Sequence, residues 1–268
     1  MNLKLLVFDL DGTLLDKKKK ISKANIEEIT KLKERGVIIA IATARPLMGF
    51  ADVRNWLNLN TSNSYFISLC GSMVRDGCGK LIDSSSVDVE DFYFIDNLAK
   101  KEKLQAAFYT DYDVYINGEK ACDELLHDLK NLGLVAKDMR EYDRKNPIGK
   151  FVIFGQSDDL DKFMSKYDSE LSEKFYTMRN NHYMYEIHNK DAGKLEGYKE
   201  LLSHIDIDNN KAIVFGDSTN DIKLLSFAGC GVAPNNAKES VKNVANYVSE
   251  FDNNSDFIAD FLINNIDK

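Results

Sequence analysis

The sequence predicts an α/β protein with a Rossmann-like parallel sheet and an α+β domain inserted into it. Short, almost wholly apolar runs alternate with helical patterns at both ends of the chain, which is typical of strands buried between helices in a parallel sheet. From residue 84 to residue 189, polar and apolar residues instead often alternate with a period of two, which is typical of antiparallel strands. We therefore expect an α/β core from residues 1–83 and 190–268, and an inserted α+β domain from residues 84–189.

The elements of the expected core follow from its apolar runs and its helix-end signals. Residues 3–8 predict a buried strand. A helix is expected over residues 22–36, because Ser22 can cap its N-terminus and Gly36 can end it. Pro46 suits the first turn of a second helix. Further strands are predicted at residues 37–43, 65–69, 211–217, 230–233 and 246–249.

The expected insertion has strands and helices of its own. One hairpin is predicted within residues 106–118, turning near residues 111–113. A second is predicted within residues 174–188, turning at residues 180–181, and a further strand lies at residues 150–155. Helices are predicted at residues 89–103, 120–132 and 158–171.

Composition and charge narrow the function classes. The 268 residues carry a net charge of -8, so a broad surface for nucleic acid or for an anionic membrane is not expected. The basic run at residues 17–20 is interpreted as a solvated turn. Asp9 and Asp11 interrupt the first apolar run, so it predicts neither a signal peptide nor a membrane span, and we expect a cytoplasmic protein. The 4 cysteines lack zinc-type spacing and are expected to be free thiols.

Asp9 and Asp11 stand two residues apart, directly after the first predicted strand. In open α/β sheets, ligands bind beyond the carboxyl ends of the strands. Residues i and i+2 project toward one side, and two carboxylates held close together resist joint ionisation unless a cation such as Mg2+ offsets their repulsion. The pair therefore indicates a metal-assisted site, although aspartates also commonly cap turns and helices.

Three further segments place polar groups at strand ends or at a helix start. Thr43 ends the second predicted strand, and Lys194 begins a helix after the insertion. Residues 216–221 (GDSTND) end a later strand and add the carboxylates of Asp217 and Asp221. Each is ordinary by itself, because a terminal threonine is usually structural and a lysine near a helix start is usually solvated. Together with Asp9 and Asp11 they supply nucleophile, acid, ammonium and metal ligands, which is the inventory for transferring a phosphoryl group.

On these residues the chain resembles the haloacid dehalogenase superfamily of phosphatases. The family's four signatures match, in order and spacing, DLDGT at residues 9–13, Thr43, Lys194 and GDSTND at residues 216–221. The insertion resembles the large α+β cap of the Cof-type subclass of sugar phosphatases, and GVAPNNA at residues 231–237 resembles that subclass's late loop, usually GVAMGNA.

The chain departs from the usual pattern of this subclass at several points. TAR at residues 43–45 replaces the usual TGR, and CGS at residues 70–72 replaces the usual NGA. Pro234 and Asn235 replace Met-Gly in the late loop, and residues 249–262 lack the usual glycine. None of these departures removes a group that the resemblance assigns to catalysis.

The resemblance implies a role for each matching residue. Asp9 would attack phosphorus and form an aspartyl-phosphate. Asp11 would protonate the leaving oxygen and then deprotonate the attacking water. Mg2+ would bind the carboxylates of Asp9 and Asp217 and the backbone carbonyl of Asp11, with Asp221 supporting the metal shell or Lys194. The phosphoryl group would be bound by Thr43, Lys194 and the backbone at Gly12, and Asn220 would contact the phosphate or orient Asp217.

The predicted activity is therefore Mg2+-dependent hydrolysis of small phosphate esters, with sugar phosphates as the first expectation and a cap that closes over the site to select the substrate. A phosphomutase of the same superfamily is the alternative enzyme. A phosphometabolite-binding protein without turnover is the alternative from another class. Candidate selective residues on the turns of the cap, each of which can equally be a surface hairpin residue, are Tyr112, Asn117, Arg179 and His182.

Overall fold

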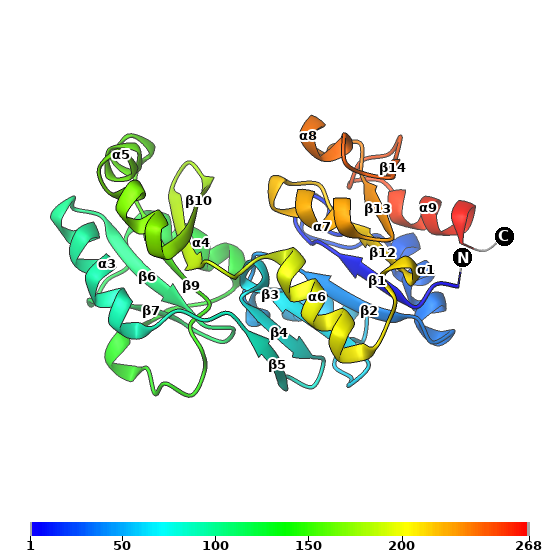
Figure 1. The fold of residues 1–268 in the computed structure, drawn as a ribbon, viewed down its shortest axis with the longest axis horizontal. Coiled ribbons are helices and arrows are strands. Elements are labelled where there is room, and N and C mark those ends of the chain that lie inside the picture. Colours follow the sequence, from blue (N-terminus) through cyan, green and yellow to red (C-terminus); the bar gives the residue numbers. More distant parts are fainter. Residues whose placement is uncertain (1, 267–268) are drawn as a thin grey trace. The chain divides into compact units, whose positions relative to one another are not determined.

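The computed structural model describes residues 2–266, which form two compact units. The core unit comprises the chain up to Ala44, Ala51–Asp83 and the chain from Gly193 onward. The inserted unit comprises Arg45–Phe50 and Ser84–Ala192. Each unit has its own sheet and its own hydrophobic core, and the elements of both are labelled in Figure 1.

The core unit is built on a sheet that, within the described residues, has eight strands. In spatial order they are β14 (Tyr247–Val248), β13 (Cys230–Ala233), β12 (Ala212–Phe215), β1 (Leu5–Phe8), β2 (Ile38–Ala42), β3 (Ser64–Ser68), β4 (Met73–Asp76) and β5 (Leu81–Ser84). The strands from β14 to β3 pair in parallel, which confirms the predicted parallel sheet. Leu5 lies opposite both Ile38 and Ala212, so the residues that follow these three central strands emerge at the same edge.

The strands β4 and β5 at one end of this sheet were not predicted. β4 runs antiparallel to β3, with Tyr65 opposite Asp76. Each of the two strands has only four residues, and β5 is mostly half-buried. Segments this short and this polar carry little periodic signal, which is why the sequence pattern did not indicate them.

Helices cover both faces of the core sheet (Figure 1). They are α1 (Lys23–Glu34), α2 (Ala51–Trp56), α6 (Lys194–Ile205), α7 (Ile222–Phe227), α8 (Glu239–Lys242) and α9 (Phe257–Asn265), with short 3-10 turns η2 (Leu69–Gly71), η4 (Asn209–Lys211) and η5 (Thr219–Asp221). On one face, Leu201 of α6 and Leu224 of α7 share a buried cluster with Val7 of β1. On the other face, the ring of Phe261 in α9 packs edge-on against Phe215 of β12, with centroids 5.6 Å apart. A sheet covered in this way is the arrangement that the apolar strands predicted.

The inserted unit has a second sheet. Its strands, in spatial order, are β10 (Phe175–Asn181), β11 (Met184–Asn189), β9 (Lys150–Phe154), β6 (Gln105–Tyr109), β7 (Val114–Ile116) and β8 (Ala136–Asp138). Its helices are α3 (Val89–Lys101), α4 (Asp123–Leu132) and α5 (Ser157–Lys174), with 3-10 turns η1 (Leu47–Phe50) and η3 (Met139–Glu141). Phe92 of α3 and Phe163 of α5 join Phe108 and Phe151 of the sheet in one buried cluster, so both helices cover the same face. All pairs except β7 with β8 are antiparallel, in agreement with the period-two pattern.

Some boundaries in the inserted unit differ from the prediction. The second hairpin turns at His182 and Tyr183, not at residues 180–181, because the carboxamide of Asn181 accepts a hydrogen bond from Tyr183 N at 2.9 Å and so starts the turn. The helix expected from residue 120 begins at Asp123. The helix expected to end at residue 171 continues to Lys174.

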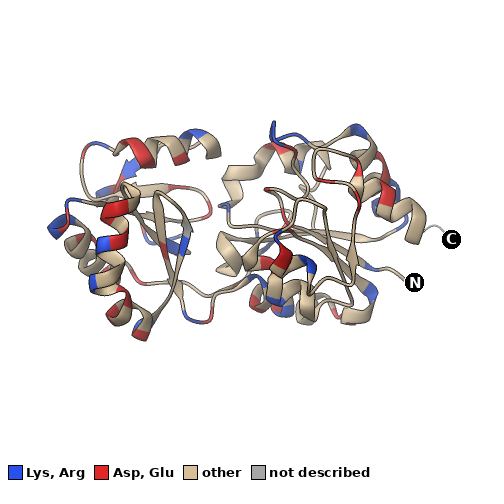
Figure 2. Ribbon diagram, turned by 90° about the horizontal axis from the view of Figure 1, so that it is seen from above, with Lys and Arg blue, Asp and Glu red and all other residues tan. Residues whose placement is uncertain are grey.

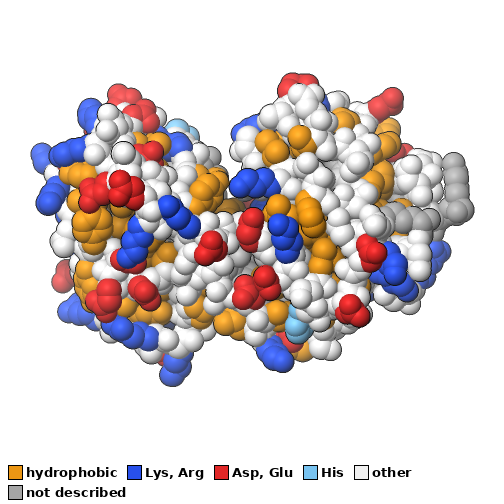
Figure 3. All heavy atoms as spheres, in the orientation of Figure 1, with side chains coloured by type: hydrophobic (Ala, Val, Ile, Leu, Met, Phe, Trp, Pro, Cys, Tyr) orange, Lys and Arg blue, Asp and Glu red, His pale blue; other side chains and the backbone are white. Residues whose placement is uncertain are grey.

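The surface and the cysteines bear on the expected partners and redox state. Among residues 2–266, no helix has the length and apolar character that crossing a membrane requires. Acidic and basic residues are interspersed along the helices of both units (Figure 2), and the face drawn in Figure 3 mixes both charges with small hydrophobic patches. The cysteines at positions 70, 78, 122 and 230 are free thiols, as predicted.

Candidate active site

Asp9 follows β1 directly and begins a loop that is closed by its own backbone hydrogen bonds. The amide of Leu14 donates to Asp9 O at 3.2 Å, and the amide of Leu15 donates to Leu10 O at 2.9 Å. Both bonds span five residues, which makes this a wide turn of the kind found in π-bulges. Its compactness keeps Asp9 at the carboxyl edge of the sheet, where its side chain is buried.

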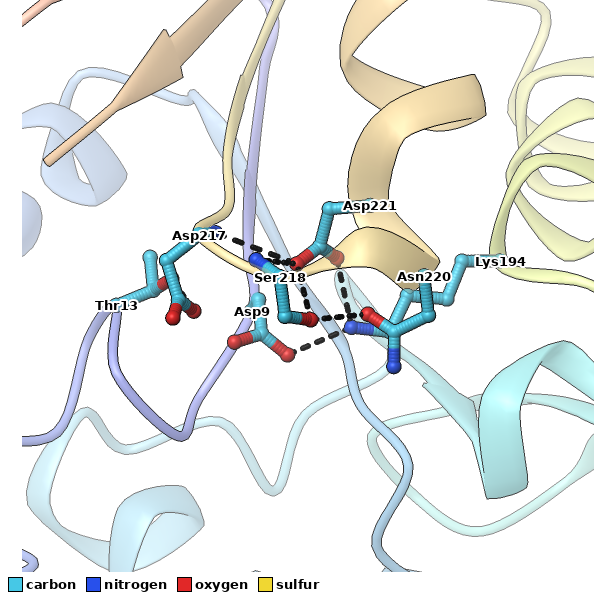
Figure 4. Close-up of polar contacts among 7 residues, drawn as sticks. All are labelled: Asp9, Thr13, Lys194, Asp217, Ser218, Asn220 and Asp221. Atoms are coloured by element: carbon cyan, nitrogen blue, oxygen red, sulfur yellow. Dashed lines mark hydrogen bonds and ion pairs between the residues drawn. The ribbon is translucent and has the colours of Figure 1, made fainter. Parts of the chain in front are cut away.

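Lys194 joins two of the predicted carboxylates. It is the first residue of α6, and its buried ammonium donates to Asp9 Oδ1 at 2.6 Å and to Asp221 Oδ1 at 2.7 Å (Figure 4). Asp9 and Asp221 are respectively 185 and 27 residues away in the chain. The parallel sheet therefore brings together three side chains that the sequence placed at separate strand or helix ends.

Asp217 completes the carboxylate group. Its Oδ1 accepts a hydrogen bond from Thr13 Oγ1 at 2.9 Å, and its side chain lies beside that of Asp9 in Figure 4. One carboxylate oxygen from each of Asp9, Asp217 and Asp221 lies within 4.8 Å of the other two. Gly12 makes this approach feasible, because it has a left-handed φ of +88° and a Cβ there would lie 2.4 Å from Asp217 Oδ2.

Asp221 is held in place by the turn that precedes it. Its Oδ2 accepts hydrogen bonds from Ser218 N at 3.0 Å and from Ser218 Oγ at 3.1 Å. The same hydroxyl lies 2.5 Å from Asn220 Oδ1 (Figure 4). Asn220, predicted to contact phosphate or to orient Asp217, is thus oriented through Ser218.

Burial and unequal charge shift the pKa values of these groups. Burial raises the pKa of Asp9 well above its ordinary value, although the Lys194 ammonium opposes this effect. Burial also raises the pKa of Asp217 to about 6, against the hydrogen bond from Thr13. The pKa of Lys194 is raised, because the charges of Asp221 and Asp9 outweigh the opposite effect of burial. One ammonium thus faces three carboxylates that resist joint ionisation.

This group fits a divalent cation. If all three carboxylates ionise, the single ammonium leaves two negative charges in excess, which is the charge of one divalent ion. Hard cations such as Mg2+ prefer carboxylate oxygen, and the described residues around the group supply no histidine or cysteine ligand to it. Asp9, Asp217 and Asp221 are therefore the residues that would hold the ion, and its charge would favour their ionised forms.

Asp11, the fourth predicted metal residue, is expected to offer its backbone carbonyl, and its side chain contacts a lysine. Its half-exposed carboxylate accepts from Lys19 Nζ at 2.5 Å, and Lys19 belongs to the basic run of residues 17–20. This run forms the expected exposed turn, closed by a bond from Lys19 N to Asp16 O at 3.0 Å. The contact between Lys19 and Asp11 was not predicted, because the basic run was interpreted as a solvated turn.

Thr43 and residues 70–72 lie along the same edge of the core sheet. Thr43 is buried after β2, and its backbone is fixed by Ile67 O at 2.8 Å and by Cys70 N at 3.0 Å. Cys70, which replaces the usual asparagine, has a left-handed φ of 59°, a conformation that asparagine adopts more readily. Gly71 is retained, and a Cβ there would lie 2.0 Å from Gly193 O, so the start of α6 at Lys194 depends on this glycine.

Two of the cap candidates are engaged within the inserted unit itself. Asn117 Nδ2 donates to Asp96 Oδ2 at 2.7 Å. The guanidinium of Arg179 donates to Asn181 O and to His182 O, each at 2.7 Å. These contacts favour a structural role for both residues.

Comparison with known proteins gives one consistent result. A family model described as haloacid dehalogenase-like hydrolase matches residues 6–262 of this chain. Phosphatase YwpJ of Bacillus subtilis (strain 168) is 24% identical over 274 residues, covering 92% of this chain and 94% of the relative. The 5-amino-6-(5-phospho-D-ribitylamino)uracil phosphatase YitU of the same organism is 26% identical over 266 residues, covering 96% of both chains.

Solved structures agree in fold. The crystal structure of a haloacid dehalogenase-like hydrolase from Bacteroides thetaiotaomicron aligns with a TM-score of 0.90 and 25% identity, covering 98% of this chain and 99% of the other. A sugar phosphatase of subclass IIB of the same superfamily aligns with a TM-score of 0.76 and 22% identity, covering 97% and 98%. These matches confirm the predicted fold class.

Proposed function

The chain belongs to the haloacid dehalogenase-like hydrolases and is a phosphatase of that family, and we propose that it uses Mg2+ to hydrolyse small phosphorylated metabolites, sugar phosphates first among them. The proposal rests on one observation above all. Two carboxylates share the buried ammonium of Lys194, and a third carboxylate lies beside them. Such a group has both a nucleophile and the charge deficit that a divalent cation offsets.

We assign the chemical steps to residues of the core unit. Asp9 forms a bond to phosphorus as the bond from phosphorus to the ester oxygen breaks, and Asp11 gives its proton to the departing oxygen. A water then attacks phosphorus, Asp11 takes its proton, and the bond between Asp9 and phosphorus breaks. Bound Mg2+ would supply charge neutralisation for Asp9 and the phosphoryl oxygens.

Other residues position the groups that react. Lys194 holds Asp9 by the 2.6 Å contact and neutralises part of the charge that builds on the phosphoryl oxygens. Asp217 and Asp221, together with Asp9, would hold the metal, and Ser218 orients Asp221. Thr43, Asn220 and the backbone at Gly12 bind the phosphoryl group in this proposal.

Substrate choice is assigned to the inserted unit, acting as a cap. Its separate core and its insertion between β5 and α6 support this role. The sugar-phosphate assignment draws on the likeness to the Cof-type subclass and on the sugar phosphatase with the same fold. The cytoplasmic location and the absence of nucleic-acid binding stay predictions.

A screen of phosphate esters at fixed Mg2+ concentration tests the proposal. Activity should disappear with a chelator and return with Mg2+, and free phosphate should appear without an added bisphosphate, which a phosphomutase would require. The Asp217→Asn enzyme should need more Mg2+ for its half-maximal rate. Asn210→Ala is the control, because Asn210 is exposed in the η4 turn, at the opposite end of β12 from Asp217. Full activity after exhaustive metal removal would overturn the metal assignment.

A further inference from the structure

The loop that carries Asp9 and Asp11 is held from outside by two asparagines near the C-terminal end of the chain. Asn236 Nδ2 donates to Gly12 O at 2.8 Å, across 224 residues of sequence. Asn253 Nδ2 donates to Leu15 O at 2.7 Å, across 238 residues. The two asparagines are themselves joined, since Asn253 N donates to Asn236 Oδ1 at 2.8 Å.

The chemistry of these contacts fixes how each carboxamide is turned. Gly12 O and Leu15 O can only accept hydrogen bonds, so each must face an amide nitrogen. Asn253 N can only donate, so it must face the oxygen of Asn236. Three bonds thus run in sequence from Gly12 through the two asparagines to Leu15, and no flipped arrangement would satisfy all of them.

The loops that carry Asn236 and Asn253 are held by further hydrogen bonds. Asn236 lies in the loop after β13, where Asn235 N donates to Phe251 O at 2.9 Å. Asn253 lies in the loop after β14, where Asp252 Oδ1 accepts from Asn254 N at 3.0 Å. This second loop falls within the C-terminal stretch that lacks the usual glycine of the subclass.

The hydrogen bond from Asn236 restrains the loop at Gly12, its most flexible residue. Gly12 directly follows Asp11, and a glycine restricts its own φ and ψ least of all residues. A bond to Gly12 O fixes the plane of the peptide between Gly12 and Thr13, and the bond to Leu15 O fixes the other end of the turn. The backbone position of Asp11 is therefore limited on its C-terminal side by side chains more than 220 residues away in the chain.

We propose that Asn236 and Asn253 are positioning residues for Asp11: through the carbonyls of Gly12 and Leu15 they keep the proton-donating carboxyl within reach of the leaving oxygen. The proposal rests on the role assigned to Asp11 above. Its alternative is that the two asparagines only tie the C-terminal loops to the core unit.

Leaving-group dependence separates these two roles. Loss of proton donation slows an ester more when its departing oxygen is more basic, whereas a general loss of folded enzyme slows all esters equally. A series of aryl phosphates from p-nitrophenyl to phenyl phosphate varies this basicity with little change in shape. The value of kcat/KM reports only the steps up to release of the first product, so breakdown of the aspartyl-phosphate does not enter.

The test compares Asn253→Ala and Asn236→Ala with wild type across this series. We expect each to lose about 10-fold in kcat/KM on phenyl phosphate and less than about 2-fold on p-nitrophenyl phosphate. Asn264→Ala is the matched control, because its exposed side chain donates to Asp260 Oδ1, one turn earlier in the same helix α9, at 2.9 Å. Its leaving-group dependence should equal that of wild type, and unfolding midpoints check that each variant is folded.

A double variant ties the effect to Asp11. Asn253→Ala combined with Asp11→Asn should lose no more than Asp11→Asn alone on phenyl phosphate, because the acid to be positioned is absent. Equal losses on all esters, no loss in either asparagine variant, or additive losses in the double variant would overturn the positioning role. An Asp11→Asn enzyme with the leaving-group dependence of wild type would instead overturn the assignment of Asp11 as the acid.

Discussion

Each unit of the protein buries a lysine against carboxylates, and the two clusters balance their charges differently. In the core unit, Lys194 is shared by Asp9 and Asp221, with Asp217 close by. In the inserted unit, Lys150 donates to Glu186 Oε1 at 2.6 Å, and Glu186 Oε2 lies 3.0 Å from His188 Nε2. Carboxylates outnumber the ammonium in the core-unit cluster, whereas in the inserted unit Glu186 lies between two nitrogen groups.

The pKa shifts follow this difference. Burial acts to raise the pKa of Glu186, but Lys150 and His188 outweigh it, so that pKa lies below its ordinary value. In the core unit burial prevails, and the pKa of Asp9 lies well above its ordinary value. The residues of the inserted unit therefore neutralise Glu186, whereas the core unit has an excess of carboxylate charge that a bound cation would offset. We infer that the arrangement in the core unit marks a functional site and that the arrangement in the inserted unit is a structural cluster.

Replacing each lysine is expected to give the largest difference between the two clusters. Lys194→Met should reduce kcat/KM by about 10³-fold or more, because it removes charge at the phosphoryl group and leaves Asp9 beside two other carboxylates. Lys150→Met should cost about 3–5 kcal/mol of unfolding free energy by leaving Glu186 without its ammonium, while folded enzyme keeps its chemical step. Kinetics and urea unfolding on the same preparations measure both effects. Equal losses of activity, corrected for the folded fraction, would contradict the distinction.

The pH dependence of the unfolding free energy should also differ in sign between the two clusters, with a smaller effect. In metal-free protein the pKa of Asp217 is raised to about 6, so the folded state binds its proton more tightly than the unfolded state. Asp217 should therefore lower the unfolding free energy as pH rises from about 4 to 6. Glu186, with a lowered pKa, should contribute stability that is lost as pH falls below its ordinary value.

One variant isolates the contribution of Asp217. Urea unfolding of wild type and Asp217→Asn in chelator, from pH 4 to 7, should show wild type losing stability relative to the variant as pH rises. Added Mg2+ should reverse that trend at the upper end of the range. If, without metal, the unfolding free energy of wild type instead rose relative to that of the variant as pH increases, the pKa of Asp217 would not be raised in the folded protein. The proposed excess of carboxylate charge around it would then be wrong.

Sequence patterns predicted the grouping of the core-unit carboxylates with Lys194 because these residues lie at the ends of strands or helices. Asp9, Asp217 and Lys194 each follow an apolar strand or begin a helix, and a parallel sheet gathers such positions at one edge. Lys150 and Glu186 were missed for the opposite reason. They occupy the polar positions of strands with period-two alternation, which pattern reasoning assigns to solvent, yet both are buried.

Contacts between distant side chains also had no signal in the sequence. Thr13 bonds Asp217 across 204 residues, and Asn236 bonds Gly12 across 224. Lys19 reaches Asp11 from a run whose charge alone indicated a solvated turn. Each contact depends on loop geometry after the strands, and neither residue periodicity nor turn propensity determines that geometry.

The most direct test of the central claim, that cation binding makes the buried carboxylate of Asp9 a nucleophile, is to trap phosphate on that residue. Asp11→Asn enzyme, mixed rapidly with p-nitrophenyl phosphate and Mg2+, should release a burst of nitrophenol and then turn over slowly, because this ester departs without an acid but Asp11 is needed as base for the water. Mass spectrometry of the acid-quenched protein should find the phosphoryl group on Asp9, and only when Mg2+ is present. Linear release with no phosphorylated peptide, or the same label in metal-free enzyme, would contradict the account.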